Sequence, residues 1–91
     1  MTPPSGLDLS GLLLVGSKQC PPCHQASEWL AAHDIEFKRV SCDGDNELIQ
    51  WLMQATGQKT VPQFFWKGEW VAGGFTEVRQ LAAQAILPKQ P

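Results

Sequence analysis

The feature that most constrains this chain is a continuous apolar run followed at once by a turn and a helical pattern. Leu12–Val15 is aliphatic throughout, Gly16 and Ser17 follow it, and beyond Cys20 the apolar positions recur at helical spacing, at Ala26, Trp29 and Leu30. An unbroken run of this kind is typical of a strand buried on both faces. A strand so buried needs cover above and below it, which predicts an α/β fold.

The next two elements are a strand and a helix. The first helix is expected to begin at the cysteines and to end near His33, because residues 35–40 then alternate as an edge strand would. Asp45 or Asn46 can cap a second helix that Gly57 ends. We expect its apolar face to consist of Leu48, Trp51, Leu52 and Ala55.

The last third of the chain predicts a hairpin and a third helix. "VPQFFWKGEWVAGG" contains two apolar runs joined by Lys67-Gly68, a length suited to a tight turn. A helical face follows and Pro88 should end it; its members are Val78, Leu81, Ala82, Ala85 and Ile86. The order is therefore β-α-β-α-β-β-α. We expect a four-stranded mixed sheet with helices on both faces, its first two strands being parallel.

Length and charge narrow the function classes. The 91 residues make one domain, 1–91, with expected flexible ends at 1–10 and 88–91. The net charge is −2 with scattered basic residues, which argues against a nucleic-acid partner. The run Leu12–Val15 is too short to cross a membrane, and the N-terminus lacks the pattern of a signal peptide. We expect a cytoplasmic monomer.

Cys20 and Cys23 form a CxxC pair at the predicted start of the first helix. Free N–H groups and the helix dipole stabilise a thiolate there and lower the pKa of a cysteine. Cys20 is thus predicted to be the nucleophile. Cys23, nearly one turn further on and expected to be more buried, can resolve a mixed disulfide on Cys20.

A CxxC pair is also half of many zinc sites, and a structural zinc needs four ligands. Only His24, His33 and Cys42 are left to supply them, so we expect no metal. Cys42 itself reads as a small apolar residue, with a regulatory thiol as the alternative.

Three segments together resemble the glutaredoxin family. They are "CPPC" after the apolar strand, "TVPQFF" at Thr60–Phe65 and "GGFTE" at Gly73–Glu77, in the family's order and at similar spacing over about Leu12–Ile86. The resemblance implies a thioredoxin-like fold and thiol–disulfide exchange by Cys20 and Cys23, with glutathione as the reductant and no metal. It implies disulfide-containing or glutathionylated proteins as substrates, with ribonucleotide reductase as a candidate.

The resemblance also implies a glutathione site. Pro62 would be cis and face the cysteines, whereas on local sequence alone it reads as a proline at the start of a strand. Val61 would offer its backbone to an extended peptide or to glutathione. Gly73, Gly74 and Thr76 would receive the γ-glutamyl end, although they also read as an ordinary loop and helix start. The complete expected set is Lys18, Pro22, Lys59, Thr60, Val61, Pro62, Gly73, Gly74, Phe75 and Thr76.

Two positions depart from the family pattern. Pro22 replaces the usual aromatic residue, and the usual basic residue three places before the first cysteine is Ser17, with Lys18 one place later. A proline before the second cysteine is similar to thioredoxins, so we expect a more reducing couple than in other glutaredoxins. One alternative is a redoxin that thioredoxin reductase reduces. Another is an iron–sulfur carrier that binds its cluster through Cys20 and glutathione, against which the rigid Pro21 argues.

Overall fold

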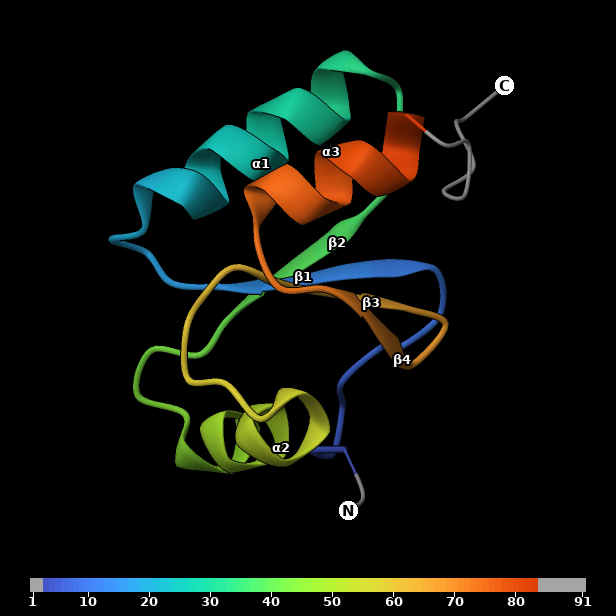
Figure 1. Cartoon of the computed structure of the whole chain (residues 1–91). Helices are drawn as coiled ribbons and strands as arrows, with labels where there is room; N and C mark the ends of the chain where they lie inside the picture. Colours follow the sequence, from blue (N-terminus) through green and yellow to red (C-terminus); the bar gives the residue numbers. More distant parts are fainter. Residues whose placement is uncertain (1–2, 84–91) are drawn as a thin grey trace.

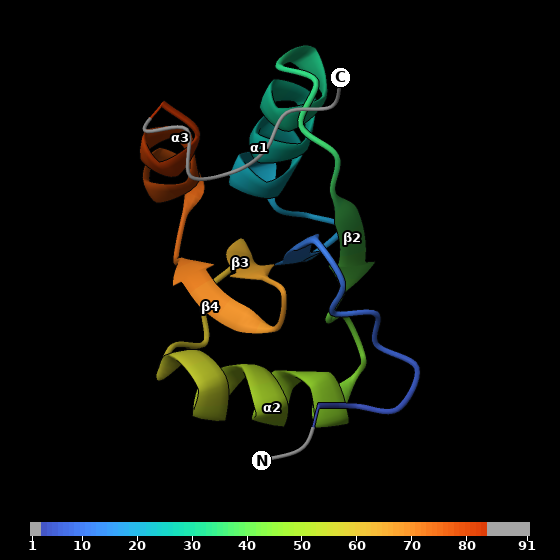
Figure 2. The same cartoon turned by 90° about the vertical axis from the view of Figure 1, so that its right-hand side faces the viewer.

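The computed structural model describes residues 3–83, and within them three layers can be followed (Figure 1). Helices α1 and α3 cover one face of a central sheet, and α2 covers the other (Figures 1 and 2). The elements follow the predicted order β-α-β-α-β-β-α. They are β1 Leu12–Gly16, α1 Pro21–Ala32, β2 Lys38–Ser41, α2 Asn46–Thr56, β3 Gln63–Trp66, β4 Glu69–Ala72 and α3 Phe75–Ala83.

The sheet is mixed and four-stranded, with the strand order β2-β1-β3-β4. β1 pairs in parallel with β2 and antiparallel with β3, and β3 pairs antiparallel with β4. β1 is therefore central and every residue of it is buried, as its unbroken apolar sequence predicts. β2 lies at an edge, as expected.

Successive residues of β1 pack into two separate hydrophobic cores, because the side chains of a strand alternate between its two faces. Leu12, Leu14 and Phe64 pack beneath α1 and α3. Leu13, Val15 and Phe65 pack against Leu48, Trp51 and Leu52 of α2. Two apolar layers on one strand explain why the run Leu12–Val15 contains no polar residue.

The hairpin between β3 and β4 has the predicted Lys67-Gly68 turn. Both residues have positive φ, 52° and 87°, which suits a two-residue turn whose twist matches the strands. The register then shifts between Phe64, opposite Ala72, and Phe65, opposite Trp70, so that Val71 is an extra residue in β4. Such a bulge increases the local twist and redirects neighbouring side chains.

One strand boundary differs from the sequence expectation. β2 begins at Lys38 rather than at residue 35, because pairing with β1 starts where Leu13 meets Lys38. Ile35 is buried, but it lies in the connection after α1, where its amide donates to the Leu30 carbonyl oxygen at 3.0 Å.

The buried face of α2 also differs by one position. Ala55 is exposed, and Thr56 is buried in its place with its hydroxyl donating to the Leu52 carbonyl oxygen at 2.8 Å. The hydroxyl is thus satisfied within the helix and can be buried. Asp45 caps α2 and Gly57, at a φ of 72°, ends it, as predicted. In α3, Val78 is buried as expected, while Ala85, Ile86 and Pro88 lie outside the described residues.

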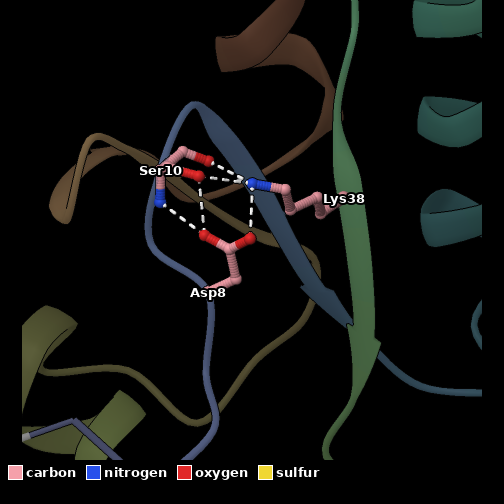
Figure 3. Close-up of polar contacts among 3 residues, drawn as sticks. All are labelled: Asp8, Ser10 and Lys38. Carbon is pink, nitrogen blue, oxygen red and sulfur yellow. Dashed lines mark hydrogen bonds and ion pairs between the residues drawn. The ribbon is translucent and has the colours of Figure 1, made fainter.

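The segment before β1 is attached to β2 by polar contacts (Figure 3). The Lys38 ammonium group lies 2.9 Å from an Asp8 carboxylate oxygen and donates to the Ser10 carbonyl oxygen at 2.7 Å. Leu7 and Leu9 pack against the α2 side of the sheet. These contacts join the segment to the sheet, while the flexible end over residues 1–10 stays a prediction.

Candidate active site

Cys20 and Cys23 are joined by a disulfide at the start of α1, with a Cα–Cα distance of 5.2 Å. Cys20 is the N-cap residue and is 6% exposed, whereas Cys23 is 0% exposed. The helix therefore begins at the first cysteine, and the second cysteine is the more buried, both as predicted. This difference in exposure leaves the Cys20 sulfur as the one that an incoming thiol or disulfide can reach.

Pro21 and Pro22 occupy the first two positions of α1 and have no N–H group. Cys23 is consequently the first helical residue that can donate to the sulfur of the N-cap, and its amide lies 3.2 Å from the Cys20 Sγ. When Cys20 is a thiolate, this single amide and the helix dipole stabilise the charge. Pro22 itself is exposed beside the cysteine pair.

The loop before β3 also lies next to the cysteine pair. The Val61–Pro62 peptide bond is cis, and Pro62 is buried. The Val61 carbonyl oxygen lies 3.8 Å from the Cys20 Sγ. The "TVP" turn thus lies beside the cysteine pair, as the resemblance implies, and the Val61 carbonyl group is next to the Cys20 sulfur.

The link from β4 to α3 contributes Gly73 and Gly74. A Cβ atom on Gly73 would lie 3.1 Å from the Gln58 Oε1, and one on Gly74 would lie 2.5 Å from the Glu77 Oε2. The Glu77 carboxylate therefore reaches back over the start of α3. Thr76 is exposed at the second position of that helix.

The remaining residues of the predicted glutathione site differ in their exposure to solvent. Lys18, Lys59 and Thr60 are exposed, so their side chains are available to a ligand. Phe75 is half-buried, with its ring edge-on to Trp29 at 6.3 Å and the Arg79 guanidinium 4.9 Å from its centre. The Phe75 ring thus takes part in the packing of α1 against α3, and the residue is still partly exposed.

Sequence reasoning missed a cluster that surrounds the segment before Cys20. Asp43 accepts hydrogen bonds from the Ser17 hydroxyl and the Lys18 amide, each at 2.8 Å. These bonds, the Lys18 amide first and the Ser17 hydroxyl next, lower the Asp43 pKa from its ordinary value of 3.8. The signal was available in part, because Asp43 follows a strand parallel to β1 and such strands end at the same sheet edge.

A buried amide behind the "TVP" turn was also missed. Gln63 is 0% exposed, and its Nε2 donates to the Thr60 carbonyl oxygen at 3.0 Å and to the Gln58 Oε1 at 2.9 Å. Its Oε1 accepts from the Trp70 indole at 2.9 Å. One side chain therefore connects the loop before β3 to β4.

Cys42 is half-buried at the end of β2, where its amide donates to the Gly16 carbonyl oxygen at 2.9 Å. Burial, and then the negative charge of Asp43, raise the pKa of the Cys42 thiol above its ordinary value of 9.0. A thiol of raised pKa is a poor nucleophile. These features agree with the expectation that Cys42 is an inert residue.

Two features found in other classes of protein are absent from residues 3–83. In that part of the chain, no three His, Cys, Asp or Glu side chains lie together as metal ligands would. None of its helices is long and apolar enough to cross a membrane.

Comparisons with known proteins agree with one another. A family model described as Glutaredoxin matches residues 12–71. The chain is 37% identical over 62 residues to a glutaredoxin of Pseudomonas aeruginosa, covering 68% of this chain and 73% of the relative. It is 33% identical over 69 residues to a glutaredoxin of Neisseria meningitidis, covering 75% and 80% of the two chains.

Solved structures show the same fold. A wheat glutaredoxin superposes with a TM-score of 0.73 at 26% identity, covering 86% of this chain and 78% of that one. A buckwheat glutaredoxin–glutathione complex gives a TM-score of 0.70 at 22% identity, covering 81% and 69%. With a matching family model, relatives of this identity, and a Cys20–Cys23 disulfide at the start of α1, the chain belongs to the glutaredoxin family and is a thiol–disulfide oxidoreductase.

Proposed function

We propose that this protein uses glutathione to reduce protein disulfides and glutathione mixed disulfides. The observation that carries the proposal is the Cys20 sulfur at 3.8 Å from the Val61 carbonyl oxygen, beside the cis-proline turn. An extended peptide with a sulfur next to Cys20 would have backbone groups of Val61 within reach. Glutathione is a short peptide of this kind.

In the proposed reaction, the Cys20 thiolate attacks one sulfur of a disulfide and releases the other sulfur as a thiol. The Cys23 thiolate then attacks the Cys20 sulfur, which releases the second thiol and leaves the Cys20–Cys23 disulfide. Two glutathione molecules reverse this state. The first forms a mixed disulfide on Cys20, and the second releases it as glutathione disulfide and restores the dithiol.

The glutathione end groups have complementary partners around the cysteines. Exposed Lys18 and Lys59 carry positive charge for a carboxylate. The first turn of α3 offers N–H groups at Thr76 to the γ-glutamyl carboxylate, and the Glu77 carboxylate has the charge to pair with the γ-glutamyl ammonium group. Pro22 cannot provide the aromatic contact that is usual at its position, so backbone groups carry a larger share of recognition.

The test is to follow the reduction of a glutathione mixed disulfide with NADPH and glutathione reductase, in the absence of thioredoxin reductase. We expect rapid NADPH consumption. Lys59→Gln should raise KM for glutathione severalfold with less effect on kcat, and Lys67→Gln, on the distant hairpin, serves as a matched control. Negligible consumption with glutathione and glutathione reductase, but rapid consumption when thioredoxin reductase replaces them, would replace this proposal by the thioredoxin-reductase alternative.

A further inference from the structure

The segment between β1 and α1 belongs to neither element, yet its backbone is bound by side chains from three other places. The Lys18 amide donates to an Asp43 carboxylate oxygen at 2.8 Å, and the Ser17 hydroxyl donates to the other at 2.8 Å. The Ser41 hydroxyl donates to Asp43 as well, at 3.0 Å. Asp43 is therefore held by β2 while it holds the segment that leads to Cys20.

The carbonyl groups of the same segment are also bound. Arg39 Nη2 donates to the Ser17 carbonyl oxygen at 3.2 Å, and the His24 Nε2 lies 2.9 Å from the Lys18 carbonyl oxygen. Arg39 Nη1 lies 3.4 Å from the His24 Nδ1. Because an arginine can only donate, the contact suits the tautomer in which the His24 Nδ1 accepts and Nε2 donates to the Lys18 carbonyl oxygen.

The position of this segment affects the thiolate because Cys20 has so few donors. Pro21 and Pro22 leave the Cys23 amide, 3.2 Å away, as the first helical N–H available to the sulfur. That contact depends on the extended N-cap conformation of Cys20, at a φ of −131° and a ψ of 97°. The peptide that enters this conformation comes directly from Lys18 and Gln19.

We propose that Asp43 is a positioning residue for thiol–disulfide exchange, which holds Ser17 and Lys18 so that the Cys20 sulfur stays on the Cys23 amide. The inference concerns the cysteine pair itself and does not depend on glutathione as the reductant. The side-chain hydrogen bonds of Asp43 go to Ser17, Lys18 and Ser41, so its effect on Cys20 passes through the segment before that cysteine.

The sign of the effect distinguishes positioning from simple charge. Removing a nearby negative charge by itself makes a thiolate easier to form and lowers a cysteine pKa. Releasing the segment weakens the contact of the Cys23 amide with the thiolate, and this raises the Cys20 pKa. A purely structural role of Asp43 would alter stability and leave the Cys20 titration in place.

The experiment measures Cys20 ionisation from the pH dependence of its alkylation by iodoacetamide. Cys23→Ser and Cys42→Ala are introduced so that Cys20 is the only thiol, and the Cys23→Ser change keeps the backbone amide. In this double-variant background, Asp43→Asn should raise the titration midpoint of Cys20 by about half a pH unit. At a pH well below the midpoint, this shift corresponds to roughly threefold less thiolate.

Asp45→Asn is the matched control, because it removes the same charge from the same loop. Asp45 caps α2 by accepting from the Leu48 amide at 3.0 Å, a task that asparagine performs equally well. We expect no upward shift in this variant. A midpoint that falls or stays constant in Asp43→Asn, or rises equally in Asp45→Asn, would overturn the proposal.

A second pair of variants decides the question if Asp43→Asn does not fold. Ser17→Ala removes one hydrogen bond to Asp43 without changing any charge, so it should raise the midpoint by a smaller amount. Ser17→Thr keeps the hydroxyl and should restore the original midpoint. Equal midpoints for Ser17→Ala and Ser17→Thr would contradict the positioning role.

Discussion

At the scale of single residues, the missing side chain of Gly16 determines how closely Cys23 can lie against β1. A Cβ atom on Gly16 would lie 3.0 Å from the Cys23 Sγ and 3.0 Å from a Leu14 methyl group. All three residues are buried, so no neighbour can move into solvent to make room. The packing of Cys23 against β1 thus requires a glycine at the end of the strand.

Gly16→Ala should therefore lower the free energy of unfolding by about 1–3 kcal/mol, the usual cost of adding a methyl group to a packed core. Urea unfolding at neutral pH, with oxidised and reduced protein measured separately, checks this. A loss below about 0.5 kcal/mol in both states would show that Cys23 has room to move.

Gln63 is a second residue whose side chain has a structural role beside the cysteine pair. Its amide group binds Thr60 on one side and Trp70 on the other, so it connects the turn before Pro62 to β4. The extra residue Val71 in β4 accompanies this contact, since it lies between Trp70 and Ala72, whose carbonyl oxygen also accepts from the indole at 3.0 Å.

Gln63→Leu keeps the approximate side-chain volume but removes the hydrogen bonds to Thr60, Gln58 and Trp70. Because these hydrogen bonds are partly buried, their remaining polar groups would lose a partner, and we expect a loss of about 1–3 kcal/mol in the free energy of unfolding. Trp70→Phe removes the indole donor and part of the ring of a side chain that is 41% exposed, and it should cost less. Urea titrations of the two variants provide the measurement, and an equal or smaller loss in Gln63→Leu would argue against the role of Gln63 as the connecting residue.

At the scale of elements, sequence periodicity predicts most of this fold. The buried run of β1, the Cys20 helix start, the Asp45 cap and the Lys67-Gly68 turn each depend on residues adjacent in sequence. The start of β2 and the exposure of Ala55 could not be predicted in this way, because they depend on where β1 and the core lie. The roles of Asp43 and Gln63 could not be predicted for the same reason, because the tertiary fold determines their hydrogen-bond partners.

Two connections between elements depend on ionised aspartates. Hydrogen bonds from Lys38 and Ser10 lower the Asp8 pKa below its ordinary value of 3.8, and hydrogen bonds from Lys18 and Ser17 lower that of Asp43. A carboxyl group of lowered pKa stabilises the fold above its unfolded pKa. That contribution is lost as the pH falls through its folded pKa.

We therefore expect the free energy of unfolding to decrease as the pH falls below about 4, the range in which an unfolded aspartate takes up its proton. The double variant Asp8→Asn, Asp43→Asn should show a smaller decrease, since it lacks both groups. Unfolding curves from pH 7 downward test this. An unchanged acid dependence in the double variant would show that other carboxyl groups are responsible.

At the scale of the whole molecule, the site forms where segments distant in sequence meet at one end of the sheet. The turn before α1, the loop before β3 and the loop after β2 lie at the same end of the sheet in Figure 1. The first two are connected by the Cys20–Val61 contact and the first and third by Asp43. The cysteine pair could be predicted from local sequence, while its surroundings required the fold.

The most direct test of the account is to compare Cys20→Ser and Cys23→Ser in the reduction of a glutathione mixed disulfide and of a protein disulfide. Cys20→Ser should lose both activities, because it lacks the attacking sulfur. Cys23→Ser should keep the first activity and lose most of the second, which needs the resolving thiol. Loss of both activities in Cys23→Ser, or retention of either in Cys20→Ser, would contradict the roles assigned to the two cysteines.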